Sequence, residues 1–97
     1  MRILGIDPGY AIVGYGILDY NANHFDVVGF GAITTGADMS FSKRLEAIYN
    51  DMCRIIDTYK PDEMGIEKLF FNTNQKNVID VAQARGGILL PAIQRGI

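Results

Sequence analysis

Residues 3–18, ILGIDPGYAIVGYGIL, set the fold that the sequence predicts. The run begins with Ile-Leu-Gly-Ile, a short apolar segment typical of a strand that is buried on both faces. Asp7 follows, and Pro8-Gly9 then favour a turn, so the predicted strand ends on a carboxylate. An aspartate before Pro-Gly is often only a turn former. The carboxyl end of a strand is also where open α/β sheets carry their sites, so both interpretations of Asp7 remain open at this point.

A β-hairpin is predicted after this first strand. Residues 12–20 and 25–35 are rich in β-branched and aromatic side chains, and the Asn-Ala-Asn segment at 21–23 favours a turn between them. Glycines recur at two-residue spacing in both strands, so one face of each strand can accept a backbone or a ligand at close range. These glycines are Gly14, Gly16, Gly29 and Gly31.

A helix and a further strand come next. From residue 41 to residue 59 apolar side chains recur at steps of three and four, which predicts an amphipathic helix that covers a sheet. The helix is expected to end at Lys60-Pro61, because the residue before a proline avoids the helical region. Residues 64–69 predict a fourth strand. A crossover helix commonly joins adjacent parallel strands, so this strand and the first one are expected to be parallel neighbours.

A second helix is predicted from about Val78 toward Ile93. Its apolar residues lie on more than one side, so it is expected to pack on both faces, against the sheet and against a partner. Pro91 conflicts with a continuous helix, and we expect a kink or an end near Leu90.

Two carboxylates are expected to meet at one edge of the sheet. Asp7 ends the first strand and Glu67 lies late in the fourth, and adjacent strands are about 4.8 Å apart. Two carboxylates this close repel each other unless a cation lies between them, and Mg²⁺ prefers such oxygen ligands. A glutamate at a strand end is more often simply solvated, so only the pair together indicates a metal site.

The composition describes a globular chain in a reducing compartment. Of the 97 residues, 48% are hydrophobic and 21% charged, no apolar run is long enough for a membrane span, and the N-terminus meets Asp7 before the hydrophobic region of a signal peptide could form. The lone Cys53 has no partner for an internal disulfide, which favours the cytoplasm. The net charge is −2, but residues 68–97 hold four basic side chains against one acidic. This basic excess suggests that more basic sequence follows.

Three motifs resemble those of one family, the RuvC family of Holliday-junction resolvases in the ribonuclease H-like superfamily. They are ILGIDPGYAIVGYGIL at 3–18, MGIEKLFFNTN at 64–74 and AQARGG at 82–87. The resemblance covers all 97 residues and implies an α/β, ribonuclease H-like mixed sheet in the order strand, antiparallel hairpin, helix, parallel strand, helix. It also implies that residues 1–97 form an incomplete resolvase domain, truncated at its C-terminus.

The resemblance implies a cytoplasmic homodimer that cuts two strands of a four-way DNA junction, beside a branch-migration helicase complex. The family uses two-metal hydrolysis with Mg²⁺, for which Mn²⁺ may substitute. Its first two carboxylates match Asp7, which would bridge both ions, and Glu67, which would hold one. The last two lie beyond Ile97, so residues 1–97 alone are expected to bind metal poorly and to cleave little.

Five further residues are candidates for DNA contact. Phe70 matches the family's aromatic residue that stacks on a base at the opened crossover, although ordinary packing is the alternative. Asn72, Asn74 and Lys76 suit phosphate contact and equally suit any solvated loop. Arg85 could support the DNA face or pair across a dimer.

Three other functions are compatible with parts of the sequence. An actin-like or sugar-kinase ATPase fragment also opens with Gly-Ile-Asp-x-Gly, but residues 10–13, Tyr-Ala-Ile-Val, offer no Ser, Thr or Lys for a phosphate. Related ribonuclease H-like nucleases act on other junctions or on RNA. A junction-binding module without catalysis is the third alternative.

Overall fold

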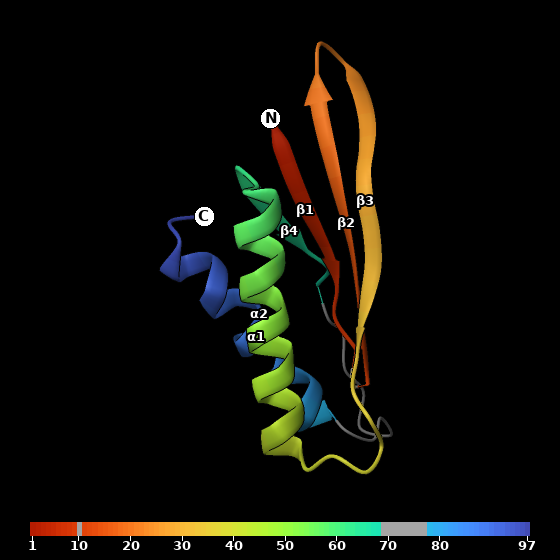
Figure 1. The fold of residues 1–97 in the computed structure, drawn as a ribbon, viewed down its shortest axis with the longest axis vertical. Helices are drawn as coiled ribbons and strands as arrows, with labels where there is room; N and C mark the ends of the chain where they lie inside the picture. The colour runs from red at the N-terminus through yellow and green to blue at the C-terminus, as the bar shows by residue number, and fades with distance from the viewer. Residues whose placement is uncertain (10, 69–77) are drawn as a thin grey trace.

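A single mixed sheet with two helices accounts for the described residues, which are 1–9, 11–68 and 78–97 of this computed structural model (Figure 1). The strands lie in the order β3-β2-β1-β4, with β1 antiparallel to β2 and parallel to β4. This arrangement confirms the predicted α/β, ribonuclease H-like sheet. The elements in chain order are β1 (Arg2–Asp7), β2 (Ile12–Asn21), β3 (His24–Thr34), α1 (Phe41–Tyr59), β4 (Glu63–Ile66) and α2 (Val78–Gln94).

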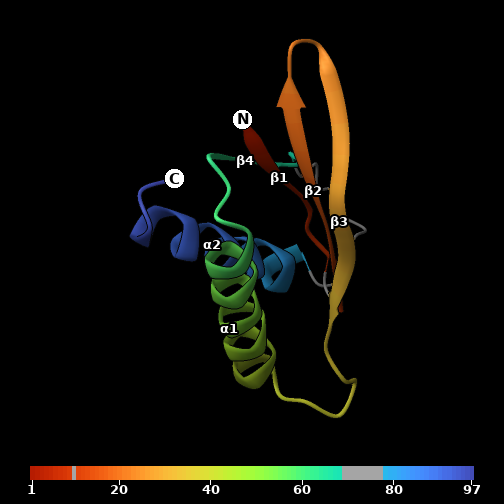
Figure 2. The ribbon, with the colours of Figure 1, turned by 45° about the horizontal axis from the view of Figure 1, so that its top comes forward.

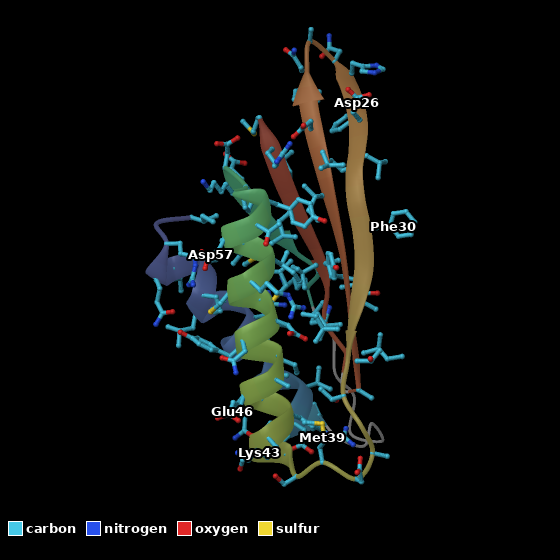
Figure 3. All side chains as sticks on the ribbon, in the orientation of Figure 1. Asp26, Phe30, Met39, Lys43, Glu46 and Asp57 are labelled. Atoms are coloured by element: carbon cyan, nitrogen blue, oxygen red, sulfur yellow. The ribbon has the colours of Figure 1, made fainter. Side chains whose placement is uncertain are left out.

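Both helices lie on the same side of the sheet (Figure 2). Side chains alternate between the two faces of a strand, and in β1 the buried Leu4 and Ile6 face the helices. In the part of the chain that the structure describes, no helix covers the opposite face (Figures 1 and 2). There the Phe30 side chain is 83% exposed and points away from the helices (Figure 3). The core between sheet and helices also includes Val13, Ile17, Ile33, Ile48, Met52, Ile55, Ile56, Ala84, Ile88 and Ala92.

The hairpin between β2 and β3 turns on two residues. Ala22 and Asn23 have φ values of 50° and 64°, and two consecutive positive φ angles are typical of the type I′ turn that suits the twist of a hairpin. The Tyr20 hydroxyl donates a 2.7 Å hydrogen bond to Asn23 Oδ1 and so supports the turn. The predicted hairpin is confirmed, with strand ends within one residue of those expected.

Helix α1 begins and ends where the sequence predicts. The Ser40 side chain accepts a hydrogen bond from the Lys43 amide at 3.3 Å, which satisfies one of the first free N–H groups. At the other end Lys60 adopts a left-handed conformation, and its amide donates to the Ile56 carbonyl at 2.8 Å. Pro61 follows and prevents a further turn.

The predicted end of the fourth strand is wrong. Strand β4 ends at Ile66, so Glu67 follows the strand rather than lying within it, while Leu69 is outside the described residues. Helix α2 continues through Pro91 to Gln94, which agrees with the predicted extent toward Ile93 and excludes an end near Leu90, while a kink there stays a prediction. An interior proline costs a helix about 3 kcal/mol. Pro91 is among the fully buried side chains, so its packing offsets that cost.

Helix α2 packs against α1 on one face. Gly87 lies against α1 so closely that a Cβ there would be 2.8 Å from Leu45 Cδ1. The exposed Ile79, Leu90 and Ile93 also belong to α2, and a partner that covers them stays a prediction. Within the described residues, neither helix has the length and apolar character needed to cross a membrane.

Candidate metal centre at the carboxyl ends of β1 and β4

Asp7 and Glu67 occupy equivalent positions at the ends of adjacent parallel strands. In the β1–β4 register Gly5 pairs with Gly65 and Ile6 with Ile66. The hydrogen bonds continue one step further, because the Glu67 amide donates to the Ile6 carbonyl at 3.0 Å. Asp7 and Glu67 therefore lie side by side at the carboxyl ends of β1 and β4. This confirms the prediction that the two acidic residues meet at one edge of the sheet.

The two carboxyl groups interact directly. A side-chain hydrogen bond with Asp7 raises the pKa of Glu67, and the negative charge of Asp7 and partial desolvation raise it further. The negative charge of Asp7 beside Glu67 thus favours the protonated form of the Glu67 carboxyl group. Both residues are exposed, so a divalent cation could reach them and take the proton's place.

The turn after Asp7 depends on Gly9. A Cβ at Gly9 would collide with the carbonyl oxygen of Ile12, so no other residue fits without a backbone shift. On the other side of the turn the Thr35 amide donates to the Ala11 carbonyl at 3.0 Å, which ties the start of β2 to the end of β3. Gly9 therefore has a structural role that is separate from the carboxylate.

A strip without side chains leads to the carboxylates on the sheet face away from the helices. Gly65, Gly5 and Gly16 are consecutive partners across β4, β1 and β2. A Cβ at Gly65 would meet nothing within 4 Å, and one at Gly5 would meet only the Gly16 carbonyl oxygen at 3.9 Å. Asp7 pairs with Gly14 at the next position on this face. A substrate backbone could approach the sheet closely here.

The glycines of β3 have a different role from the one predicted. A Cβ at Gly29 would lie 3.2 Å from the Tyr59 hydroxyl, and one at Gly31 would lie 2.7 Å from the Tyr15 hydroxyl. Both positions therefore accept tyrosine side chains on the helix side of the sheet. These glycines do allow another group to approach closely, as predicted. In β3 that group is a tyrosine side chain of the same chain and not a ligand.

The donor set suits a hard cation. Carboxylate oxygens are the ligands that Mg²⁺ and Mn²⁺ prefer, and Mg²⁺ usually takes only one or two carboxylates and completes its shell with water and phosphate oxygens. Within residues 1–9, 11–68 and 78–97 there is no group of three or more His, Cys, Asp or Glu side chains that could hold a metal. Asp7 and Glu67 thus fit part of a metal site.

Arg85 is the one predicted DNA-contact residue that the structure describes. Its Nη1 donates a 2.7 Å hydrogen bond to the backbone carbonyl of Glu67. No sequence pattern predicts this contact, which links α2 to the residue that carries the second carboxylate. The predictions for Phe70, Asn72, Asn74 and Lys76 fall outside the described residues and stay predictions.

A mixed sheet with a crossover helix before β4, and with acidic residues ending β1 and following β4, defines the ribonuclease H-like class of α/β proteins. Within this class the match is specific. The family model of the crossover junction endodeoxyribonuclease RuvC matches residues 3–97. The chain belongs to the RuvC family.

Known relatives agree with this assignment. The crossover junction endodeoxyribonuclease RuvC of Fusobacterium nucleatum is 52% identical over 97 residues, which are 100% of this chain and 51% of that protein. The protein of the same name from Clostridioides difficile is 51% identical over 96 residues, 99% of this chain and 57% of that protein. The chain thus spans little more than half the length of these relatives.

A solved structure shares the fold. It is described as Thermus thermophilus RuvC in complex with a Holliday junction substrate, and it superposes with a TM-score of 0.88 at 21% identity. The superposition covers 100% of this chain and 60% of that one.

Proposed function

We propose that the complete protein carrying this chain is an endonuclease that resolves four-way DNA junctions, with Asp7 and Glu67 as catalytic, metal-binding residues. The observation that carries the proposal is the carboxylate pair at the ends of β1 and β4 in a chain of the RuvC family. Adjacent carboxylates at exposed strand ends are an unfavourable arrangement without a cation. A metal-binding function at this position would account for both acids.

Each carboxylate has a distinct part in the proposal. Asp7 is held at the end of β1 by the strand and by the turn that follows, and would bridge two ions. Glu67 would hold one ion. Bound Mg²⁺, or Mn²⁺ in its place, would supply a water activated for attack on the phosphodiester and stabilise the leaving oxygen.

The DNA would be held by groups on either side of this pair. Phe70 would stack on a base at the crossover, an interaction worth about 1–3 kcal/mol that tolerates any base. Asn72, Asn74 and Lys76 would contact phosphates, which position the duplex without reading its sequence. The glycine strip formed by Gly5, Gly16 and Gly65 leaves room for a backbone near the carboxylates.

The assembly is also proposed. A homodimer would present two such sites and cut two strands of one junction symmetrically, beside a branch-migration helicase complex in the cytoplasm. Residues 1–97 by themselves would be an incomplete resolvase domain that binds metal weakly and nicks little, because only two family carboxylates, Asp7 and Glu67, match positions within them.

The test is Mg²⁺-dependent nicking of a synthetic four-way junction by the complete protein and its Asp7→Asn variant, with linear duplex as control DNA. Paired nicks near the crossover that disappear in Asp7→Asn would support the proposal. Nicking that is equal in both proteins would contradict the role of Asp7. Junction binding without nicking in any divalent metal would favour a binding module, and saturable nucleotide binding would favour an ATPase fragment.

A further inference from the structure

Glu67 is held by hydrogen bonds on both sides of its backbone. Its amide donates to the Ile6 carbonyl of β1 at 3.0 Å, and its own carbonyl accepts from Arg85 Nη1 at 2.7 Å. Glu67 lies one residue beyond the end of β4, and β1 ends at Asp7. The sheet thus fixes the Glu67 amide, whereas a side chain from a helix fixes its carbonyl.

Arg85 is well placed to act as an anchor. It belongs to α2, and the residue before it, Ala84, and Ile88 one turn later are 1% and 0% exposed in the core. Residues 85 and 67 are 18 positions apart in the sequence. The contact therefore ties the exposed end of β4 to a helix that the core holds in place.

The contact restrains Glu67 against a force that the site itself creates. Asp7 and Glu67 follow the paired residues Ile6 and Ile66 of adjacent parallel strands, so their two negative charges repel each other and tend to separate the side chains. Because Arg85 donates to the peptide carbonyl, this bond leaves the carboxylate oxygens of Glu67 available to a cation. A guanidinium bound to the carboxylate itself would compete with the metal for the same oxygens.

We propose that Arg85 is a positioning residue, which fixes the Glu67 backbone so that the Asp7 and Glu67 carboxylates stay close enough to share a divalent cation. This inference rests on the function proposed above and assigns Arg85 a role other than DNA contact. Removal of groups that orient metal ligands typically weakens metal affinity or activity by 10–100-fold. Arg85→Met is therefore expected to weaken divalent metal binding about 10-fold.

The test compares Arg85→Met, Arg85→Lys and the control Arg54→Met in the complete protein. Arg54 forms an exposed ion pair with Asp51 on α1, so its variant removes one arginine without touching the site. Mn²⁺ affinity is measured by titration calorimetry, without DNA. Arg85→Lys, which retains a cationic donor, should recover part of the loss, and Arg54→Met should bind Mn²⁺ like the parent protein.

Two measurements distinguish a positioning role of Arg85 from a general loss of folded structure. In metal-free protein the ¹⁵N shift of the Lys68 amide, which shares its peptide group with the Glu67 carbonyl, should change in Arg85→Met while core amides keep their shifts. In nicking assays the half-saturating Mg²⁺ concentration should rise about 10-fold, and the rate at saturating Mg²⁺ should return to within about twofold of the parent.

Asp7→Asn distinguishes failure of this inference from failure of the proposed function. If Asp7→Asn abolishes Mn²⁺ binding while Arg85→Met leaves it unchanged, Arg85 is not a positioning residue and the metal site stands. If Arg85→Met lowers junction affinity but not Mn²⁺ affinity, Arg85 contacts DNA and the inference is overturned. If Asp7→Asn itself binds Mn²⁺ normally, the proposed metal site is wrong and the inference falls with it.

Discussion

Asp7 and Glu67 lie side by side at the carboxyl ends of two parallel strands, and hydrogen bonding to Asp7, together with its negative charge, raises the pKa of Glu67. The native state therefore binds the Glu67 proton more tightly than the unfolded chain does. Stability from this proton is fully present below the ordinary pKa of 4.5 and is lost as the pH rises through the raised native value.

The first prediction concerns metal-free stability. Glu67→Gln keeps a hydrogen-bond donor beside Asp7 but has no charge at any pH, so it should be more stable than the parent at pH 7, with a gain that vanishes below about pH 4. Urea unfolding in EDTA at several pH values measures this difference. A gain that is the same at pH 4 and pH 7 would exclude repulsion by Asp7 as its cause. Mg²⁺ should raise the Tm of the parent protein and leave that of Glu67→Gln nearly unchanged.

Much of this site follows from the sequence because two segments share one pattern. Gly5-Ile6-Asp7 and Gly65-Ile66-Glu67 have the same order of glycine, isoleucine and acid, and the structure pairs Gly5 with Gly65 and Ile6 with Ile66. A crossover helix between two apolar strands predicts their parallel pairing. The acids then meet at one edge as a consequence of strand geometry.

Other features depend on tertiary contacts that no local pattern encodes. The length of β4 depends on where pairing with β1 stops, since the sequence through residue 69 remains compatible with a strand. Pro91 remains inside α2 because the core buries it. Helix propensity describes only local preferences and does not include such packing. The bond from Arg85 to the Glu67 carbonyl joins residues 18 positions apart through a backbone atom, so the sequence carries no signal for it.

The second prediction concerns acid unfolding. Asp57 accepts hydrogen bonds from Arg95 Nε at 2.7 Å and Nη2 at 3.2 Å, which tie α1 to the residue after α2 (Asp57 is labelled in Figure 3). These bonds lower the pKa of Asp57, so their stabilisation is present above the ordinary value of 3.8 and is lost as the pH falls through the lowered native value. Asp57→Asn should therefore be less stable than the parent protein at pH 7. Its stability should also fall less than that of the parent when the pH is lowered.

Thermal unfolding between pH 7 and pH 2 measures this second effect. Asp51→Asn is the matched control, since it removes an exposed ion pair within the same helix without breaking a contact between helices. Parallel Tm curves for Asp57→Asn and the parent protein would mean that the link to Arg95 contributes nothing to acid sensitivity.

The third prediction concerns the turn of the hairpin. Ala22 has a φ of 50°, a left-handed conformation that costs an alanine about 1 kcal/mol and that asparagine adopts more easily. Ala22→Asn should raise the free energy of unfolding by roughly 0.5–1 kcal/mol, and Ala22→Val should lower it because a β-branched residue is strained there. Urea titration measures both. A stabilising valine would show that the turn is not left-handed at this position.

The fourth prediction uses two adjacent glycines of α2. A Cβ at Gly86 would meet nothing within 4 Å, whereas one at Gly87 would lie 2.8 Å from Leu45 Cδ1. Alanine is favoured over glycine inside a helix by about 1 kcal/mol, so Gly86→Ala should raise the free energy of unfolding by roughly 0.5–1 kcal/mol. Gly87→Ala should gain less or lose stability, because Leu45 must move and overpacking costs about 1–3 kcal/mol.

Equilibrium urea unfolding of the two glycine variants tests this packing. An unchanged m-value would show that the unfolded state is not altered. Leu45→Ala tests whether the contact between the two helices causes this difference. Without the leucine side chain, Gly87→Ala should gain the same helix-propensity benefit as Gly86→Ala. A double-mutant cycle between positions 45 and 87 should therefore give a coupling of about 1 kcal/mol or more. Equal effects at Gly86 and Gly87, with no coupling to position 45, would mean that α1 and α2 do not approach each other at Gly87.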